Sequence, residues 1–445
     1  NDDKALQEDY ELEFSTVSSD GSSDDNGNDP NDEDDSDNGK DKGDSKGESD
    51  QTKSYYANID ATGGSQDAQV PITVNSQTGQ ASVDLREMAE EIFGRDENTV
   101  IGVPSIPGVN TYTLEMLAAT LSGGSGKASL IFETPVGSVQ IRSGMLSGMS
   151  GLEGKLASIS IAAGDKTKLS DEIRKTLGDR PLVQLTLTLD GKQVDWNNPA
   201  VPVTVTIPYN PTAEELLNPE SIVVWYIDGS GCVVSVPNGH YDPIRGTVTF
   251  ITTHFSYYAV VYNPVSFKDV AAGEWYKKAV DFIAARKITL GTGNGNFSPK
   301  AMITRGEFIT LLMRAYEIAP DENPADNFSD GGNTYYTGYL AAAKRLGISQ
   351  GVGNNLFAPG NEITRQEVFT MLYNALRVID RLPQGSSGKT LTNFTDADEI
   401  SIWAKEAITL LVETGTIVGN NEKLSPGDKA TRAEMAQVMY NLLSK

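Results

Sequence analysis

Three arginines stand in the same four-residue motif in the C-terminal part of the chain. The motif occurs as Thr304-Arg305-Gly306-Glu307, Thr364-Arg365-Gln366-Glu367 and Thr431-Arg432-Ala433-Glu434. Its Thr and Glu predict a capping box at a helix start. The cap leaves the Arg unexplained, because a cation in the first turn opposes the helix macrodipole. Beside exposed N–H groups, the same cation is a receptor for a carboxylate or phosphate. The Arg therefore either binds an anion or forms a structural salt bridge to a neighbouring Asp.

Each motif closes a unit that opens with Phe-x-Asp. The openings are Phe267-Lys268-Asp269, Phe328-Ser329-Asp330 and Phe394-Thr395-Asp396, and the Arg follows each Phe by 37 or 38 residues. Between the two motifs lie an apolar stripe at helical spacing and a loop rich in Gly and Asn that ends in Pro. The loops start at Gly291, Gly351 and Gly419. We predict helix, loop, helix three times, with the copies packed against each other.

These units resemble S-layer homology repeats, which hold bacterial surface proteins to the cell wall. The resemblance rests on the Phe-x-Asp start, an aromatic residue six or seven positions after the Asp, the Gly-rich loop and the Thr-Arg-x-Glu close. It implies an all-α pseudo-threefold bundle in which grooves between repeats bind secondary cell-wall polysaccharide, often capped with a pyruvate ketal. Carried over by motif, the groove residues are Asp269, Trp275, Gly291 and Arg305 in repeat one (264–326), Asp330, Tyr336, Gly351 and Arg365 in repeat two (327–392), and Asp396, Trp403, Gly419 and Arg432 in repeat three (393–445).

The chemistry of these residue types suits such a ligand. Arg pairs bidentately with a carboxylate, Asp accepts from sugar hydroxyls, and an aromatic face stacks on a pyranose ring. Each type also has a structural alternative. Trp275, Tyr336 and Trp403 begin apolar stripes, so they pack either in the core or against sugar. The Asp residues are either helix caps and turn formers or ligand contacts.

Upstream of the repeats, residues 55–263 read as a mainly-β region. Alternating runs predict strands at 69–74, 182–189, 203–207, 222–227, 247–251 and 257–261. Two helices are predicted, at 84–92 and 113–119. The expected architecture is one or two β-sandwich units. Residues 202–257 resemble a β-rich module that precedes S-layer homology repeats in Gram-positive surface proteins, which favours a spacer or adhesion role whose partner the sequence does not indicate.

The first 54 residues differ sharply in composition. They hold 19 Asp and Glu against 5 Lys, a net charge of −14 out of −25 for the whole chain. With almost no apolar residues after Val17, this segment predicts a disordered, self-repelling linker. Tyr10–Phe14 alternates like a short strand. The Asp-rich run at 25–29 lacks the Glu that closes an EF-hand, so no calcium site is predicted.

The sequence offers few of the residue types and motifs that catalytic sites use. One cysteine, Cys232, and two histidines, His240 and His254, exclude a Cys/His metal site. We expect His254, at a strand start, to be half-buried. Residues 121–128 mimic a P-loop but lack its first Gly and its final Ser or Thr. Paired carboxylates for glycoside hydrolysis stay open, since the fold sets their separation. We expect no enzyme activity, metal or cofactor.

The remaining features agree with a secreted protein. The sequence contains no run of 18 apolar residues, so no membrane span is predicted. Its excess of acidic residues argues against nucleic acid as a partner. The chain starts at Asn1, so it is either mature or the tail of a longer protein. We expect a non-catalytic surface protein, anchored to the cell wall or S-layer outside the cell. The alternatives are the anchoring part of an extracellular polysaccharide hydrolase whose catalytic domain precedes residue 1, or an S-layer lattice subunit.

Overall fold

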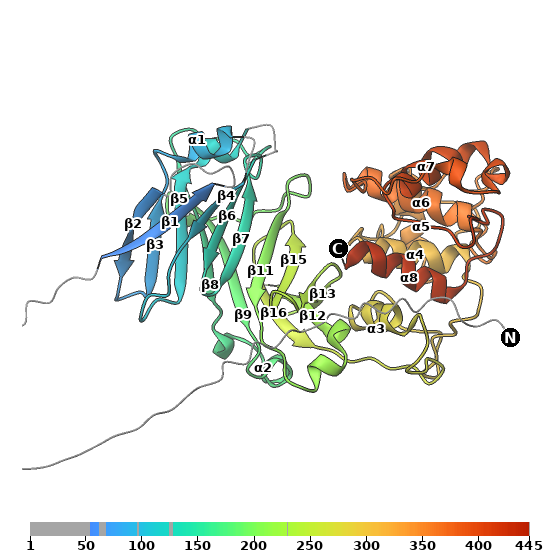
Figure 1. Ribbon diagram of the computed structural model, residues 1–445, viewed down its shortest axis with the longest axis horizontal. Helices are drawn as coiled ribbons and strands as arrows, with labels where there is room; N and C mark the ends of the chain where they lie inside the picture. Colours follow the sequence, from blue (N-terminus) through green and yellow to red (C-terminus); the bar gives the residue numbers. More distant parts are fainter. Residues whose placement is uncertain (1–53, 62–67, 96–97, 124–127, 229, 445) are drawn as a thin grey trace, which may run out of the picture. The chain divides into compact units, whose positions relative to one another are not determined.

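The computed structural model describes residues 54–61, 68–95, 98–123, 128–228 and 230–444. The acidic segment predicted to be disordered lies outside these residues except for Ser54, as do the Asp-rich run and the strand predicted at Tyr10–Phe14. Part of the P-loop-like stretch, residues 124–127, also lies outside them. Figure 1 shows the described strands in blue to yellow and the helices of the repeats in yellow to red.

The described part of the upstream region forms one sheet of 16 strands. The strands are β1 (Tyr55–Ala61), β2 (Ala68–Asn75), β3 (Gln80–Asp84), β4 (Thr99–Gly102), β5 (Thr111–Leu117), β6 (Ser129–Thr134), β7 (Gly137–Arg142), β8 (Leu156–Ala163), β9 (Leu182–Leu189), β10 (Lys192–Gln193), β11 (Val203–Pro208), β12 (Ile222–Ile227), β13 (Val233–Val236), β14 (His240–Asp242), β15 (Thr247–Thr252) and β16 (Tyr257–Tyr262). The six strands predicted from alternation are confirmed as β2, β9, β11, β12, β15 and β16. The prediction of a β-rich region is therefore confirmed.

The strand order is β13-β12-β16-β9-β8-β5-β3-β2-β1-β4-β6-β7-β11-β15-β14, with β10 beside β9. Neighbours are antiparallel except for β3 with β5 and β4 with β6. Near one end of this order, β12 packs against β14 and β15 at the other end, so the sheet folds back on itself. Side chains from both halves, among them Ile159 of β8 and Val139 of β7, share one core. One continuous sheet, folded around this main core, thus occupies the region predicted to hold one or two sandwich units.

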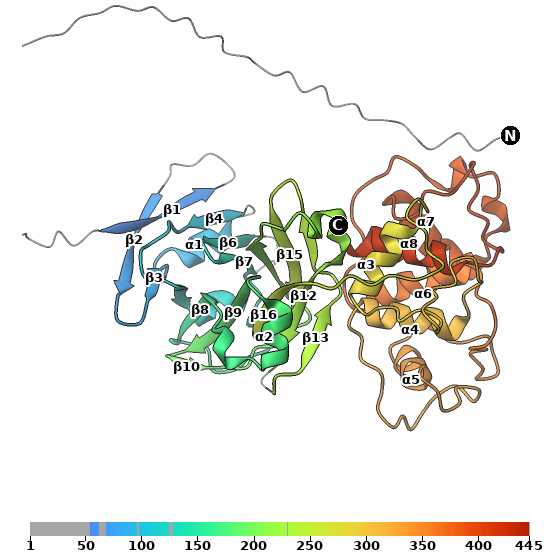
Figure 2. The ribbon, with the colours of Figure 1, turned by 90° about the horizontal axis from the view of Figure 1, so that it is seen from below.

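The helix predicted at 113–119 is wrong, because residues 113–117 belong to strand β5 and only the last two begin a short 3-10 helix, η1 (Ala118–Leu121). Alternate residues Tyr112, Leu114 and Met116 point into the core and are almost fully buried. Polar Thr113 and Glu115 alternate with these three residues in the sequence, which is the period of two expected for a strand. The helix predicted at 84–92 is found in part as α1 (Ala89–Gly94), and α2 (Asp171–Leu177) packs on β16 (Figure 2).

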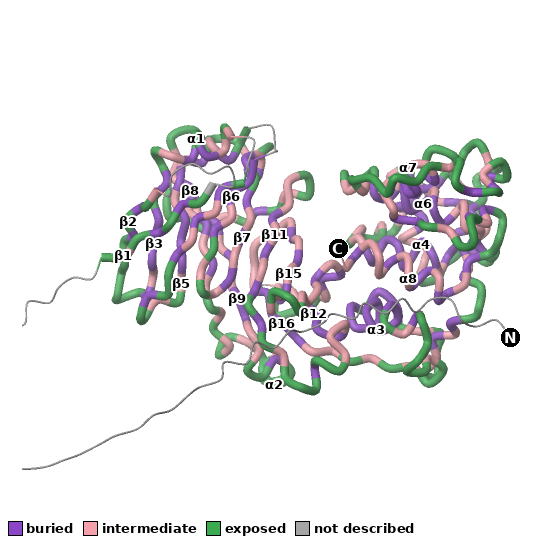
Figure 3. Tube along the Cα trace, in the orientation of Figure 1, coloured by how far each residue is buried: buried purple, intermediate pink, exposed green. Residues whose placement is uncertain are grey.

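The repeats supply two helices each. These are α3 (Lys277–Ala285) and α4 (Arg305–Ala315), α5 (Thr337–Arg345) and α6 (Arg365–Val378), and α7 (Lys405–Glu413) and α8 (Arg432–Leu443). The first helix of one repeat packs on the second helix of another, α5 on α4, α7 on α6 and α3 on α8. The described residues of all three repeats bury their apolar faces in one shared core, shown as purple segments in Figure 3. None of the described helices has the length and apolar character needed to span a bilayer.

A closed ring of backbone hydrogen bonds joins the extended segments before the second helices. The N–H of Ile303 donates to the carbonyl of Ala430 over 3.0 Å, and the N–H of Ala430 donates to Ile363 over 3.1 Å. The N–H of Ile363 completes the ring by donating to Ile303 over 3.0 Å. All three residues are buried. Because each repeat supplies one donor and one acceptor, no repeat can satisfy these buried groups alone.

The first repeat is joined to the sheet through a buried guanidinium. Arg286, just after α3, donates to the carbonyl oxygens of Gly239 (2.9 Å), Glu220 (2.7 Å) and Ile222 (3.2 Å). Burial lowers its pKa to about 9, partly opposed by the charge of Glu220. The group is therefore still a cation at neutral pH. Ala285 packs beside it in a small apolar core with residues of β12 and β16. The junction is thus packed like a protein interior.

Removing this guanidinium tests the junction. Arg286→Met leaves several buried carbonyls without a donor, at about 1–3 kcal/mol for each group that water cannot reach. We expect the free energy of unfolding to fall by about 2–4 kcal/mol, measured by urea denaturation. As a matched control, Arg345→Met removes an exposed ion pair with Asp321 and should cost less than about 1 kcal/mol. Equal losses in the two variants would show that Arg286 does not hold the junction.

Candidate functional site

The three predicted capping boxes are confirmed. Thr304, Thr364 and Thr431 stand at the N-caps of α4, α6 and α8. Each Thr hydroxyl accepts from the backbone N–H of the Glu three residues on, and Oε2 of that Glu accepts from the Thr N–H over 2.7–2.9 Å. The second carboxylate oxygen of each Glu, Oε1, is left for another partner.

That partner is the Arg of another repeat. Arg305, Arg365 and Arg432 each donate from Nη1 to a capping Glu and from Nε to a loop carbonyl. Their acceptors are, in order, Glu367 and Phe357, Glu434 and Leu424, and Glu307 and Phe297. Repeat one thus reaches repeat two, repeat two reaches repeat three, and repeat three returns to repeat one. We call this closed set the Arg–Glu ring.

The sequence left open whether these arginines bind an anion or form a structural salt bridge to an Asp. In the structure they form the salt bridge, but the partner is a Glu. The side chains of Arg305 and Arg432 are only 4% and 5% exposed, whereas that of Arg365 is 20% exposed. Burial lowers the pKa of Arg305 and of Arg432, and the facing carboxylates of Glu367 and Glu307 oppose this shift. Direct contact of the arginines with an anionic ligand stays a prediction, and any such ligand shares each cation with a protein carboxylate.

The three Asp residues hold the loops that the arginines reach. Asp269, Asp330 and Asp396 each accept from two successive backbone N–H groups, at Phe297 and Ser298, Phe357 and Ala358, and Leu424 and Ser425. The first residue of each pair also offers its carbonyl to the Arg. Burial would raise the pKa of Asp269 and Asp396, but these N–H donors outweigh it and the pKa of each lies below its ordinary value. The Asp residues are thus turn formers, and their contact with sugar stays a prediction.

The three predicted glycines are required by close packing. Gly291, Gly351 and Gly419 have φ between +68° and +78°. A Cβ on Gly351 would lie 2.2 Å from the carbonyl oxygen of Leu356 and 2.8 Å from the ring of Phe328, and the other two meet Phe267 and Phe394 in the same way. Each Gly thus lies against the Phe of its own Phe-x-Asp motif.

The predicted aromatic residues differ from expectation in two ways. The two tryptophans are exposed, and the equivalent residue in repeat two lies one position earlier than predicted. Trp275 and Trp403 are 61% and 55% exposed, so core packing is excluded for them. The residue equivalent to them in repeat two is Tyr335, which is 59% exposed and directly precedes the N-cap Tyr336. Tyr336 itself is half-buried and packs against Gly306. Tyr336 therefore does not occupy the position of Trp275 and Trp403, and its contact with a ligand stays a prediction.

A sequence signal for Tyr335 existed. Trp275, Tyr335 and Trp403 each stand five residues before an aliphatic residue of the first helix, Val280, Leu340 and Ile408. These three are fully buried. Counting from the Asp instead misplaced the aromatic, because the turn between Asp and helix varies in length among the repeats.

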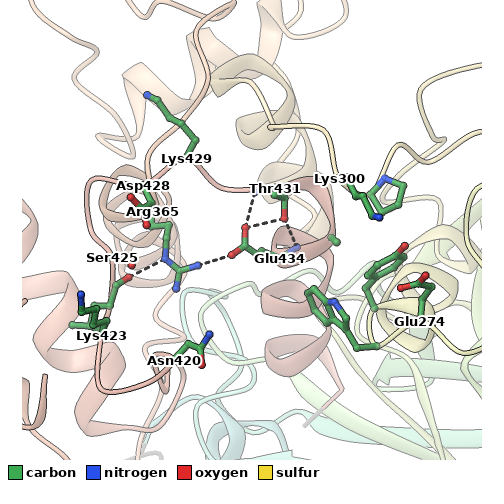
Figure 4. A pocket seen from close by; sticks show the side chains of 15 residues that line it. Glu274, Lys300, Arg365, Asn420, Lys423, Ser425, Asp428, Lys429, Thr431 and Glu434 are labelled. Atoms are coloured by element: carbon green, nitrogen blue, oxygen red, sulfur yellow. Dashed lines mark hydrogen bonds and ion pairs between the residues drawn. The ribbon is translucent and has the colours of Figure 1, made fainter. Parts of the chain in front are cut away.

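Two cavities lie between the repeats, and each is lined by all three of them. Groove A, of about 550 Å³, contains Arg305 of repeat one, Glu367 and Gly351 of repeat two, and Trp403 of repeat three. Groove B, of about 540 Å³, contains Trp275 of repeat one, Arg365 of repeat two, and Asn420 and Glu434 of repeat three. Figure 4 shows Arg365 and Glu434 paired in the middle of groove B.

The third junction follows the same rule. Arg432 of repeat three pairs with Glu307 of repeat one, and Tyr335 of repeat two lies within electrostatic reach of both. The site residues predicted for one repeat are therefore distributed over three different junctions. Grooves A and B each place an exposed aromatic ring beside a paired cation, with loop residues of the remaining repeat on the wall.

Cys232, His240 and His254 all lie in the upstream β-rich region. Among the described residues, no cluster of three or more His, Cys, Asp and Glu could hold a metal ion. Cys232 is exposed. His254 is half-buried as predicted, and its Nδ1 lies 3.0 Å from the hydroxyl of Tyr258. Burial lowers the pKa of His254.

The Arg–Glu ring predicts unequal losses on neutralising its carboxylates. Glu367→Gln keeps a carbonyl for the cap but leaves the buried Arg305 without a counter-charge, so we expect a loss of about 2–4 kcal/mol. Glu434→Gln faces the more exposed Arg365 and should cost only about 1 kcal/mol. Urea unfolding of the full chain measures both. The reverse order would contradict the burial difference between the two pairs.

The loop glycines predict a second stability difference. Gly351→Ala places a Cβ against backbone and should cost about 3 kcal/mol or more. Gly347→Ala has a similar φ, +72°, but open space around the added Cβ, so backbone strain alone should cost about 1–2 kcal/mol. Repeat one already carries Lys287 at the position of Gly347, with φ +58°. Thermal unfolding compares the two variants, and similar melting temperatures would argue against the Phe contact as the cause.

Comparison with known proteins places these repeats in a family. The S-layer homology domain model matches residues 266–309, 327–369 and 393–436, each within one predicted repeat. The chain is 31% identical over 248 residues to an amylopullulanase of Thermoanaerobacterium thermosulfurigenes, 28% identical over 205 residues to the S-layer protein sap of Bacillus anthracis, and 31% identical over 188 residues to the exoglucanase XynX of Acetivibrio thermocellus.

The alignments cover 55%, 45% and 42% of this chain but only 13%, 24% and 17% of those proteins. The chain therefore spans a small part of the length of the relatives it matches. The first alignment, at 248 residues, is longer than the region from 266 to 436, so the likeness to the amylopullulanase includes residues outside the three matched domains. Residues 266–436 hold three S-layer homology domains, which imply anchoring to the cell wall and indicate a protein of the cell surface or extracellular space.

Proposed function

We propose that this chain is a non-catalytic anchor that binds secondary cell-wall polysaccharide through the junctions between its three repeats. The finer architecture in this proposal is a pseudo-threefold helical bundle with three related grooves. The observation that carries it is the composition of grooves A and B, each of which takes its aromatic ring, its Arg and its loop from three different repeats. A ligand in such a groove contacts all three repeats, so no single repeat provides a complete site.

The exposed aromatics support a sugar ligand. Large aromatic rings are expensive to leave in water, and Trp275, Tyr335 and Trp403 hold equivalent exposed positions in three copies. Their flat apolar faces suit the C–H face of a pyranose ring, while the Asn-rich loop and the Arg–Glu pair offer hydrogen bonds to hydroxyl and acidic groups.

Sedimentation with purified cell-wall sacculi tests the proposal. We expect the full chain to sediment with native sacculi and to stay in solution after hydrofluoric acid has stripped the wall polysaccharide. Trp275→Ala and Trp403→Ala should each weaken binding about fivefold to tenfold, or about 1–1.4 kcal/mol, without lowering thermal stability, because both rings are exposed.

Tyr56→Ala, which removes an exposed ring of β1, serves as the control and should bind like the unmodified chain. Full sedimentation with stripped sacculi would exclude the polysaccharide as the target. Unchanged binding by the double variant Trp275→Ala/Trp403→Ala would exclude the aromatic role.

A second candidate function is the anchoring part of an extracellular polysaccharide hydrolase. The likeness to an amylopullulanase and an exoglucanase favours it, whereas the likeness to S-layer proteins favours a lattice subunit. The coding sequence upstream of Asn1 tests this candidate. A catalytic domain encoded there would support the hydrolase, and its absence would contradict it. Two-dimensional arrays formed by the purified chain would identify a lattice subunit.

A further inference from the structure

We infer that groove B is the groove that selects an acidic polysaccharide, and that Lys300 and Lys423 are the residues that give it this selectivity. The inference rests on the proposed function, because it assumes that the grooves bind the wall polymer. It adds which groove recognises charge and which side chains do so.

The arginines of the ring cannot supply this selectivity by themselves. Each guanidinium is paired with a capping Glu, at 3.1 Å for Arg365 with Glu434 and 2.9 Å for Arg432 with Glu307. A paired cation and carboxylate contribute almost no net charge at the distance of an approaching polymer. Attraction of an anion must therefore come from other charges in the grooves.

The two grooves differ in these other charges. Besides its ring pair, groove A is lined by one cation, Arg377, and one carboxylate, Glu406, so its net charge is zero. Glu406 also accepts a hydrogen bond from the hydroxyl of Tyr373 over 2.7 Å. Charge therefore gives groove A no preference between a neutral and an acidic polymer.

Groove B carries an excess of positive charge. Besides the ring pair it is lined by three lysines, Lys300, Lys423 and Lys429, against two carboxylates, Glu274 and Asp428. Lys429 donates to the backbone carbonyl of Glu362 over 2.9 Å and so is partly held in place. Lys300 and Lys423 form no ion pair within the described part of the chain.

The two lysines stand on opposite sides of the ring pair. In Figure 4, Lys423 and Lys300 flank Arg365 and Glu434, Lys423 on the loop side and Lys300 on the side of Glu274. Lys423 belongs to repeat three and Lys300 to repeat one, so an acidic chain lying along the groove meets cations from two repeats. Between them, Arg365 is the most exposed arginine of the ring, at 20%.

Binding of released wall polysaccharide to the full chain tests this inference, by calorimetry at 50 mM and 300 mM NaCl. We expect Lys300→Gln/Lys423→Gln to bind native polymer at least about fivefold more weakly at 50 mM salt, and the deficit to shrink at 300 mM as screening removes the charge term. Polymer whose carboxylates have been reduced to alcohols should bind both proteins alike. Both lysines are exposed, so the melting temperature should not change.

A matched variant removes two exposed cations that line neither groove, Lys192→Gln/Lys389→Gln, and should stay within twofold of the unmodified chain. Equal affinity of the lysine variant and the unmodified chain for native polymer would overturn the inference and leave the anchor itself standing, as would an equal loss in the matched variant. An unmodified chain that binds no wall polymer at all would overturn both proposals.

Discussion

The C-terminal half of the structure depends on the Arg–Glu ring. Each capping Glu serves two repeats at once, with Oε2 closing its own helix cap and Oε1 accepting from the Arg of another repeat. A buried guanidinium that lost this carboxylate would carry an uncompensated charge in a low-dielectric interior. Loss of this Glu would therefore weaken the helix cap, the ion pair and the contact between repeats at once. The motif Thr-Arg-x-Glu supplies the residues for all three.

In the proposed function, the ring also limits which groups of the grooves are free to recognise a ligand. The capping Glu residues neutralise the charges of the arginines, so ligand recognition has to come from side chains that do not hold the repeats together. Trp275 and Trp403 are exposed on the groove walls, and Lys300 and Lys423 carry charges without an ion-pair partner among the described residues. Residues common to all three repeats thus build the scaffold, while residues that differ between repeats, such as the lysines of groove B, make the junctions chemically unequal.

Sequence reasoning succeeded where the signal is local. The capping boxes follow from Thr and Glu three residues apart, and strands such as β9 follow from strict alternation. It failed where the answer depends on contacts distant in sequence. Nothing in repeat one alone shows that Arg305 pairs with Glu367, 62 residues away, or that Trp403 shares a groove with Arg305. The helix predicted at 113–119 is wrong although Tyr112, Leu114 and Met116 alternate with polar Thr113 and Glu115, because a short apolar run is compatible with either element until its pairing partners, here β3 and β8, are known.

The junction at Arg286 limits how the upstream region can serve the anchor. A spacer that only separates two functions needs no buried contacts, yet here a buried cation binds carbonyls at the end of the sheet and Ala285 packs against β12 and β16. Tyr440 of α8 also hydrogen-bonds Glu220 beside the sheet, so the first and third repeats both contact it. The upstream region and the repeats are thus joined through hydrogen bonds and packed side chains of both the first and the third repeat.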